Sequence, residues 1–125
     1  MKITHLKAAA VAALGLSLPV QAASAADQID IGKQEFEASC AVCHGLSGKG
    51  DGRYAPILEG VSLPDLTTLS QRNGGAFPME RVYEQIDGRT SVRTHGPRKM
   101  PVWGDLLEPA RIQAIVDYLY RLQAK

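Results

Sequence analysis

Apolar residues recur at helical spacing in three segments of the chain. In residues 31–41, Gly32, Phe36 and Cys40 fall on one face of a helix. Residues 78–87 and 109–123 carry similar stripes, formed by Met79, Val82, Tyr83 and Ile86 in the second segment and by Ile112, Ile115, Val116, Leu119 and Leu122 in the third. Such stripes predict three main helices that each bury one face.

The residues that flank these segments are suited to helix ends. Asp30 precedes the first segment as a candidate N-cap, and Pro78 occupies the first turn of the second. A shorter turn or helix is predicted over residues 64–71, with Ser62 and Asp65 at capping-box spacing. No segment shows a convincing strand pattern, so the predicted fold class is all-α.

Two long loops separate the predicted helices. Residues 45–60 are rich in glycine, and residues 88–104 are basic and have no clear period. Loops of this length in a small domain usually carry a function or surround a bound group. We therefore expect three main helices, a short helix and long loops wrapped around one ligand.

Residues 1–26 have the pattern of a secretory signal peptide. Lys2 and Lys7 supply the positive start, residues 8–20 form an apolar centre, and residues 23–26 offer small side chains for cleavage. The apolar centre is too short and too rich in alanine for a membrane span, so no stable membrane insertion is expected.

The remaining residues, 27–125, are predicted to form one small domain of nearly balanced charge. The whole chain has 14 Lys and Arg against 13 Asp and Glu, which gives a net charge of +1. Removal of the leader with its lysines, Lys2 and Lys7, changes this to −1. Nucleic-acid binding depends on excess positive charge, so no nucleic-acid partner is expected.

The only two cysteines of the chain lie in the segment Cys40-Ala41-Val42-Cys43-His44. A pair of cysteines at this spacing, followed directly by histidine, is the attachment pattern of a c-type haem. Each thiol is able to add to one vinyl group of the porphyrin, and the adjacent imidazole is able to bind the iron. The motif predicts one covalent haem c, attached to Cys40 and Cys43, with His44 as the proximal ligand.

The cysteine pair has three possible uses other than haem attachment. A zinc site needs four ligands, and only His95 is left as a distant nitrogen donor. A thioredoxin-like site requires alternating strands and helices, which the pattern lacks. A disulfide between the two cysteines would close a tiny loop and contribute little stability.

Met100 is the strongest candidate for a ligand on the opposite side of the iron. It lies in a loop far from His44 in sequence, and Pro101 after it keeps its backbone extended. Met79 and His95 are the competing donors. Met79 lies on the apolar face of a predicted helix, where core packing is expected, and a solvated side chain is expected for His95.

Side chains near these residues also have expected roles. Arg53, Tyr54, Trp103 and the arginines of residues 89–98 are candidates for hydrogen bonds to the haem propionates, or else ordinary surface residues. The basic loop 89–99 is expected to form a positive rim that steers docking onto acidic partners. An apolar shell around the haem is expected from Leu58, Leu66, Leu69, Phe77, Val82, Ile86 and Ile115.

These motifs resemble those of the class I (cytochrome c-like) single-haem cytochromes over nearly the whole domain. Cys40, Cys43 and His44 match the thioether positions and the proximal ligand of that family, and Met100 lies in a segment similar to its distal methionine segment. The face that begins at Gly32 resembles one of its two crossed terminal helices, where glycine allows close approach and aromatic residues pack over it.

The segment Ala55-Pro56-Ile57-Leu58 resembles a family segment whose proline carbonyl accepts a hydrogen bond from the proximal imidazole. The resemblance implies that Pro56 orients His44 in this way. The family usually has glycine at the position of Ala55.

The resemblance implies a cytochrome c-like fold and a single-electron carrier of the bacterial periplasm, not an enzyme. The expected partners are redox proteins such as a dehydrogenase, an oxidase or a cytochrome complex, and the expected state is a monomer or a subunit of such a complex. The alternative is a haem-based ligand binder or sensor in which Met100 is labile or absent from the iron. A small peroxidase is disfavoured because the sequence shows no acid–base pair beside the distal ligand.

Overall fold

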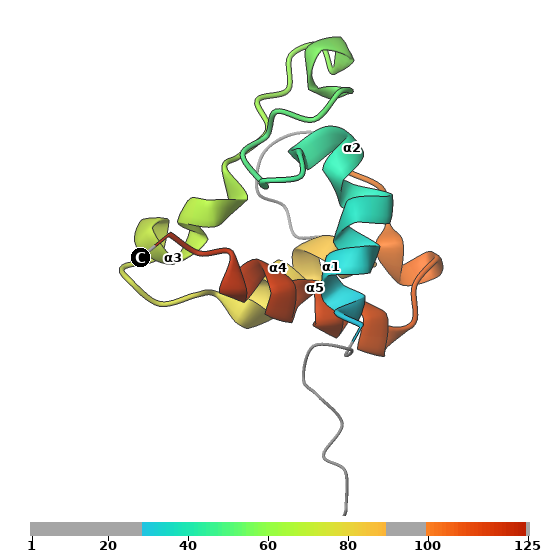
Figure 1. Ribbon diagram of the computed structural model, residues 1–125, viewed down its shortest axis with the longest axis vertical. Helices are drawn as coiled ribbons and strands as arrows, with labels where there is room; N and C mark the ends of the chain where they lie inside the picture. The colour runs from blue at the N-terminus through green and yellow to red at the C-terminus, as the bar shows by residue number, and fades with distance from the viewer. Residues whose placement is uncertain (1–28, 90–99, 125) are drawn as a thin grey trace, which may run out of the picture.

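The computed structural model describes residues 29–89 and 100–124 (Figure 1). All regular structure in these two stretches is helical, so the predicted all-α class is confirmed. None of the helices in the described part has the length and apolar composition needed to cross a membrane. The predicted signal peptide at 1–26 and His95 lie outside the described residues.

A continuous helical run covers residues 31–44. It consists of α1 (Ile31–Glu35), the π-helical segment η2 (Phe36–Cys40) and α2 (Ala41–His44). The Asp30 carboxylate caps its start by accepting a hydrogen bond from the backbone N–H of Lys33 at 3.1 Å. The run continues past its predicted end at 41, so it ends with the last residue of the C-x-x-C-H motif.

The middle of the chain contains only short helices, at η3 (Ala55–Ile57), η4 (Leu66–Thr68) and α3 (Leu69–Arg72). The last two correspond to the helix predicted over 64–71. Its N-cap is Asp65 rather than Ser62, because the Asp65 carboxylate accepts hydrogen bonds from the backbone N–H of Thr67 at 2.8 Å and from its hydroxyl at 2.6 Å.

Two longer helices, α4 (Met79–Asp87) and α5 (Pro109–Arg121), confirm the predictions for 78–87 and 109–123, and the short η5 (Trp103–Asp105) lies between them. Val82 and Ile86 of α4 are buried, but Met79 is 41% exposed. The prediction that Met79 packs in the core is therefore wrong. The period of a helix sets the face of a residue, but not how far along the helix the core extends.

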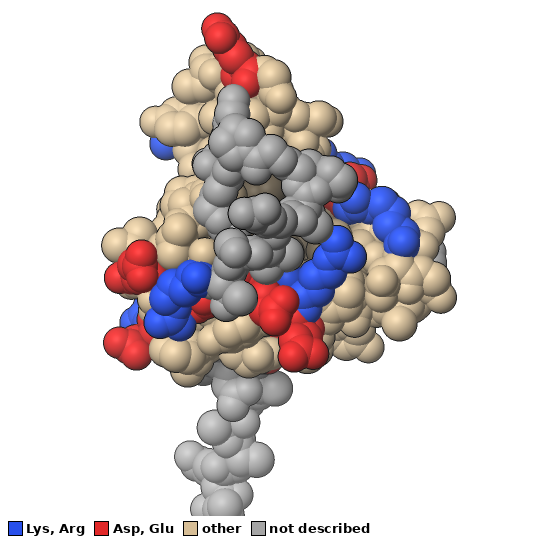
Figure 2. Space-filling view, turned by 180° about the vertical axis from the view of Figure 1, so that it is seen from behind, with Lys and Arg blue, Asp and Glu red and all other residues tan. Residues whose placement is uncertain are grey.

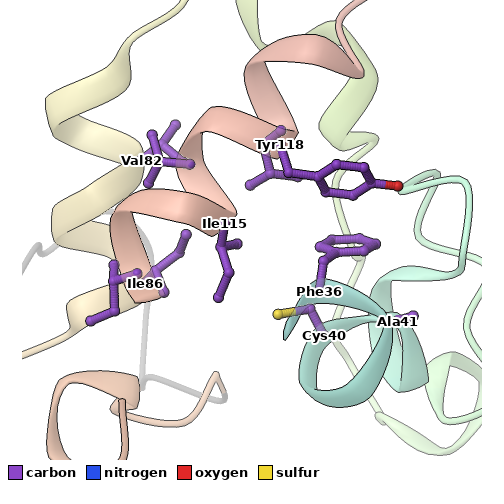
Figure 3. Packing of buried hydrophobic residues seen from close by; sticks show 10 residues of the cluster. Phe36, Cys40, Ala41, Val82, Ile86, Ile115 and Tyr118 are labelled. Atoms are coloured by element: carbon purple, nitrogen blue, oxygen red, sulfur yellow. The ribbon is translucent and has the colours of Figure 1, made fainter. Parts of the chain in front are cut away.

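α1 crosses α5, and the hydrophobic core lies between α5 and side chains of η2, α2 and α4 (Figures 1 and 3). A Cβ atom at Gly32 would lie 2.0 Å from the backbone oxygen of Ala114, so only glycine permits this approach. The ring of Phe36, 1% exposed, packs against that of Tyr118 with centroids 5.4 Å apart. The predicted close contact of glycine and aromatic residues in the crossed helices is confirmed.

Polar contacts fasten both ends of α5. Near its C-terminal end Arg121 pairs with Asp30 at 2.6 Å, and near its start Arg111 pairs with Glu35. Just beyond the helix, the Gln123 side-chain amide donates to the carbonyl of Leu66 at 2.8 Å and its oxygen accepts from the backbone of Ser70 at 2.9 Å. The end of the chain therefore lies beside α3, as Figure 1 shows.

Candidate functional site

The two cysteines of the motif lie in different environments on one helical run. Cys40, the last residue of η2, is 7% exposed, and its sulfur points toward Ile86 and Ile115 (Figure 3). Cys43 lies on α2 and is half-buried. Both are free thiols, so no disulfide joins them.

Burial, reinforced by the nearby negative charges of Glu35 and Cys43, raises the pKa of the Cys40 thiol to about 12. The thiol is neutral at pH 7, whereas thioredoxin-like and metal sites use the thiolate. Within residues 29–89 and 100–124, His, Cys, Asp and Glu side chains form no group of three that could hold a metal ion. These residues therefore do not support the zinc and thioredoxin-like alternatives.

The imidazole ring of His44 is neutral at pH 7. Burial lowers its pKa, because the charged form loses hydration, so at pH 7 its ring keeps a lone pair for a metal. The Nδ1 atom is fully buried and has no hydrogen-bond partner in the described part of the chain. A buried polar atom of this kind needs a partner.

The predicted partner of that nitrogen, the carbonyl of Pro56, does not bond to it in this structure. Ala55–Ile57 forms the tight helical turn η3, in which Leu58 N–H donates to the carbonyl of Ala55 at 3.3 Å, and Pro56 is exposed. The role of Pro56 in orienting His44 stays a prediction.

The loop after the motif closes onto the end of the helical run. The last four carbonyl groups of a helix have no partner within it. Here each accepts a backbone N–H from the loop at 2.8–3.1 Å: Ala41 from Gly45, Val42 from Tyr54, Cys43 from Gly52 and His44 from Gly50. The backbone of the motif is thus held along its whole last turn.

Gly52 is central to this closure. A Cβ atom there would lie 2.5 Å from backbone atoms of Val42 and Cys43, so a larger residue would force the loop away. The glycine-rich composition of residues 45–60 did not by itself reveal this role. The signal that could have found it is the repeated glycine at Gly48, Gly50 and Gly52.

Met100 is half-buried and packs against the hydrophobic cluster that includes Cys40. The structure thus brings the predicted distal ligand and one thioether position, which lie far apart in sequence, to the same apolar region. Trp103, one of the candidates for hydrogen bonds to the haem propionates, also packs against this cluster.

Most of the predicted apolar shell is present. Val82, Ile86 and Ile115 are buried in the cluster. Leu66, Leu69 and Phe77 are partly buried against it, whereas Leu58 does not belong to it. Among the proposed propionate ligands, Arg53 and Tyr54 are both exposed, with the guanidinium of Arg53 lying 5.4 Å from the Tyr54 ring centroid.

Comparison with known proteins assigns the family. Residues 27–119 match the family described as "Cytochrome C oxidase, cbb3-type, subunit III". The chain belongs to the class I cytochromes c. Proteins of this family carry a covalently bound haem c and transport electrons, which confirms the cofactor predicted from the cysteine and histidine motif.

Individual relatives agree with this assignment. This cytochrome is 30% identical over 113 residues to "Cytochrome c6, chloroplastic" of Chlamydomonas reinhardtii, which covers 90% of this chain and 66% of that protein. It is 31% identical over 94 residues to "Cytochrome c6" of Tetradesmus obliquus, covering 72% of this chain and 85% of that protein.

A third relative is much longer than this chain. Over 109 residues the cytochrome is 32% identical to "Cbb3-type cytochrome c oxidase subunit CcoP" of Azospirillum sp. (strain B510), which covers 86% of this chain. The match spans only 32% of that protein.

The described residues fit a covalent haem. Two free thiols and a neutral imidazole lie on one helical run, at the spacing that the attachment requires. The Cys40 sulfur points toward buried apolar side chains, which suit a large flat apolar group (Figure 3).

Proposed function

We propose that this cytochrome is a periplasmic single-electron carrier, not an enzyme, whose haem iron is bound by His44 and Met100. The observation that supports this ligand pair is the packing of Met100 against the buried cluster that includes Cys40. When bound, the haem supplies one-electron chemistry, because its iron alternates between the ferric and the ferrous state.

Cys40 and Cys43 provide the attachment. Each S–H group would add across one vinyl double bond of the haem, with sulfur bonded to one carbon and hydrogen to the other, so no further reactant would be consumed. Cys40 of η2 and Cys43 of α2 would thus hold the haem next to the imidazole of His44.

The ligands and their surroundings set the reduction potential. A histidine and methionine pair gives a comparatively high potential. The apolar side chains of Ile86 and Ile115 act in the same direction, because a low-dielectric environment disfavours the additional positive charge of the ferric state. Both residues are nearly fully buried.

The ligand pair is tested with two methionine variants of the holoprotein. The ferric wild type is expected to show the weak near-infrared band of iron–sulfur ligation, and Met100→Ala is expected to lose it. Met79→Ala is the matched control, because Met79 is exposed at the start of α4 and should leave the band unchanged.

The same spectra test the alternative function. A wild-type protein that has no near-infrared band, and whose ferrous form is high-spin and binds CO readily, would contradict ligation by Met100. That result would favour a ligand binder or sensor.

For location and partners, we propose that residues 1–26 direct export and are removed, and that the domain exchanges electrons with redox enzymes. Two relatives named cytochrome c6 and one named as an oxidase subunit support redox partners of this class. Cell fractionation and N-terminal sequencing of the mature protein test the export. A cytoplasmic protein with an intact N-terminus would contradict it.

The proposed docking surface is the positive rim at 89–99. Of this loop only Arg89 lies among the described residues, and it pairs with Asp87. On the face seen in Figure 2, basic and acidic side chains of the described residues lie next to one another. Electron-transfer rates that fall steeply with rising salt would support the rim, and rates independent of salt would contradict it.

A further inference from the structure

The end of α4 carries an ion pair between a buried carboxylate and a half-exposed arginine, close to the segment that contains Met100. Asp87, the last residue of α4, is only 6% exposed. Arg89 donates to its Oδ1 atom from Nε at 2.9 Å and from a terminal guanidinium nitrogen at 2.6 Å. The backbone N–H of Arg89 also donates to Oδ2 at 3.2 Å. A buried carboxylate requires partners of this kind.

The segment after Met100 packs directly against this pair. A Cβ atom at Gly104, in η5, would lie 2.4 Å from Oδ1 of Asp87 and 2.5 Å from Nε of Arg89. Gly104 does not have a positive φ, so the glycine is needed for space and not for backbone conformation. A larger residue would therefore disturb this contact, by displacing either η5 or the side chains of Asp87 and Arg89.

The charge of Asp105, the acidic residue of η5, acts on Arg89 as well. Arg89 has a raised pKa, mainly because of its hydrogen bond to Asp87, and Asp105 makes a smaller contribution in the same direction. Met100 precedes η5 by only a few residues, and both Met100 and Trp103 pack on the core.

We propose that Asp87, Arg89 and Gly104 form a latch that positions Met100 as the distal ligand of the iron. The latch rests on the proposed function, since it presumes ligation by His44 and Met100. Its members are positioning residues: they act by fixing η5 against the end of α4, which restricts the places that the Met100 sulfur can occupy.

The chain offers a matched control for the arginine. Arg121 pairs with Asp30 at 2.6 Å, the same distance as between Arg89 and Asp87, and both arginine side chains are 52% exposed. The Arg121 pair links α5 to the cap of α1, away from η5. If Arg89 contributed only to stability, its replacement and the replacement of Arg121 would have the same effect on binding of Met100 to the iron.

The experiment uses ferric holoprotein and added imidazole, which competes with Met100 for the iron. Variants Gly104→Ala, Asp87→Asn and Arg89→Gln are compared with Arg121→Gln and with wild type. We expect the latch variants to bind imidazole roughly tenfold more tightly and to show a weaker near-infrared band, because the ligating position of Met100 is less populated. Arg121→Gln should match wild type in both measurements.

The outcomes separate the latch from the proposed ligand pair. If wild type has no near-infrared band, or binds imidazole as tightly as Met100→Ala, ligation by Met100 itself is wrong. If wild type has the band and the latch variants bind imidazole no more tightly than Arg121→Gln, only the latch is wrong. Gly104→Ala keeps the charges of Asp87 and Arg89, so it still tests the latch if Asp87→Asn does not fold.

Discussion

The two ends of the helical run at 31–44 are held by different forces. The first part, through Cys40, is held by side-chain packing against α5, with Gly32 against Ala114 and Phe36 against Tyr118. The last part, α2, is held by backbone hydrogen bonds from the loop that follows it. Packing of this kind depends on buried apolar area, whereas the hydrogen bonds depend on the loop conformation.

The proposed cofactor-binding residues are divided between these two parts. Cys40 belongs to the packed part, and His44 ends the part that the loop holds. We infer that damage to the packing lowers mainly the stability of the fold. Damage to the loop should instead change the position of the proximal imidazole. Substitutions of glycine in each part, and of the Asp30 cap, test this division.

Gly32→Ala should have the largest effect. The new Cβ atom would overlap the backbone of Ala114, which cannot move independently of α5, so we expect a loss of about 3 kcal/mol in the free energy of unfolding. Urea unfolding of the holoprotein, followed by circular dichroism, measures this loss. The folded fraction should keep the visible spectrum of the wild type.

Gly74→Ala is the control for a glycine replacement that causes no steric overlap. Gly74 has a φ of 69° and nothing within 4 Å of an added Cβ atom. Its cost is therefore only the strain of a left-handed conformation, about 1 kcal/mol. Equal losses in the two variants would contradict the close approach of α1 and α5.

Gly52→Ala tests the end of the run that the loop holds. The added Cβ atom would collide with the backbone of Val42 and Cys43, so we expect a loss of about 2 kcal/mol in stability. Unlike Gly32→Ala, it should also change the visible spectrum of the holoprotein, since the imidazole of His44 loses its support.

Gly48→Ala is the control in the same loop. A Cβ atom there would be 3.6 Å from the nearest atom, an ordinary contact, so only backbone strain is added. A spectrum of Gly52→Ala identical to that of Gly48→Ala would show that the loop closure does not orient His44.

Asp30→Asn should have the smallest effect, a small loss of stability at neutral pH that disappears at low pH. The hydrogen bond from Lys33, with a further contribution from Arg121, lowers the pKa of the Asp30 carboxyl. A group with a lowered folded-state pKa contributes stability above its unfolded value, about 3.9, and loses this contribution as the pH falls through the folded value. Asparagine still caps the helix but does not titrate, so the acid-induced loss of stability should be smaller in the variant.

Melting temperatures measured from neutral pH to below about pH 3 test this prediction, since that range covers the unfolded pKa of the carboxyl. Arg121→Gln separates the two causes: it removes the ion pair but leaves the hydrogen bond from Lys33, so most of the acid dependence should persist. An Asp30→Asn protein that loses stability in acid as steeply as wild type would show that Asp30 does not contribute.

The fold class, the cofactor and the faces of the long helices could be predicted from the order of residues along the chain. Helical period depends on neighbours along the chain, and so the stripe of α5 and the pair of Gly32 and Phe36 were predicted correctly. The attachment motif is equally local, because both thiols and the imidazole lie within five consecutive residues, 40–44.

Contacts between residues far apart in the sequence became evident from the three-dimensional fold. It placed Met100 on the cluster that includes Cys40, left Met79 exposed, and closed the loop onto α2 through Gly52. It also brought Gly104 against the pair of Asp87 and Arg89, although nothing in their order along the chain indicates the contact. Such contacts depend on how helices cross and how tightly backbones approach, and the periodicity of one segment carries no information about either.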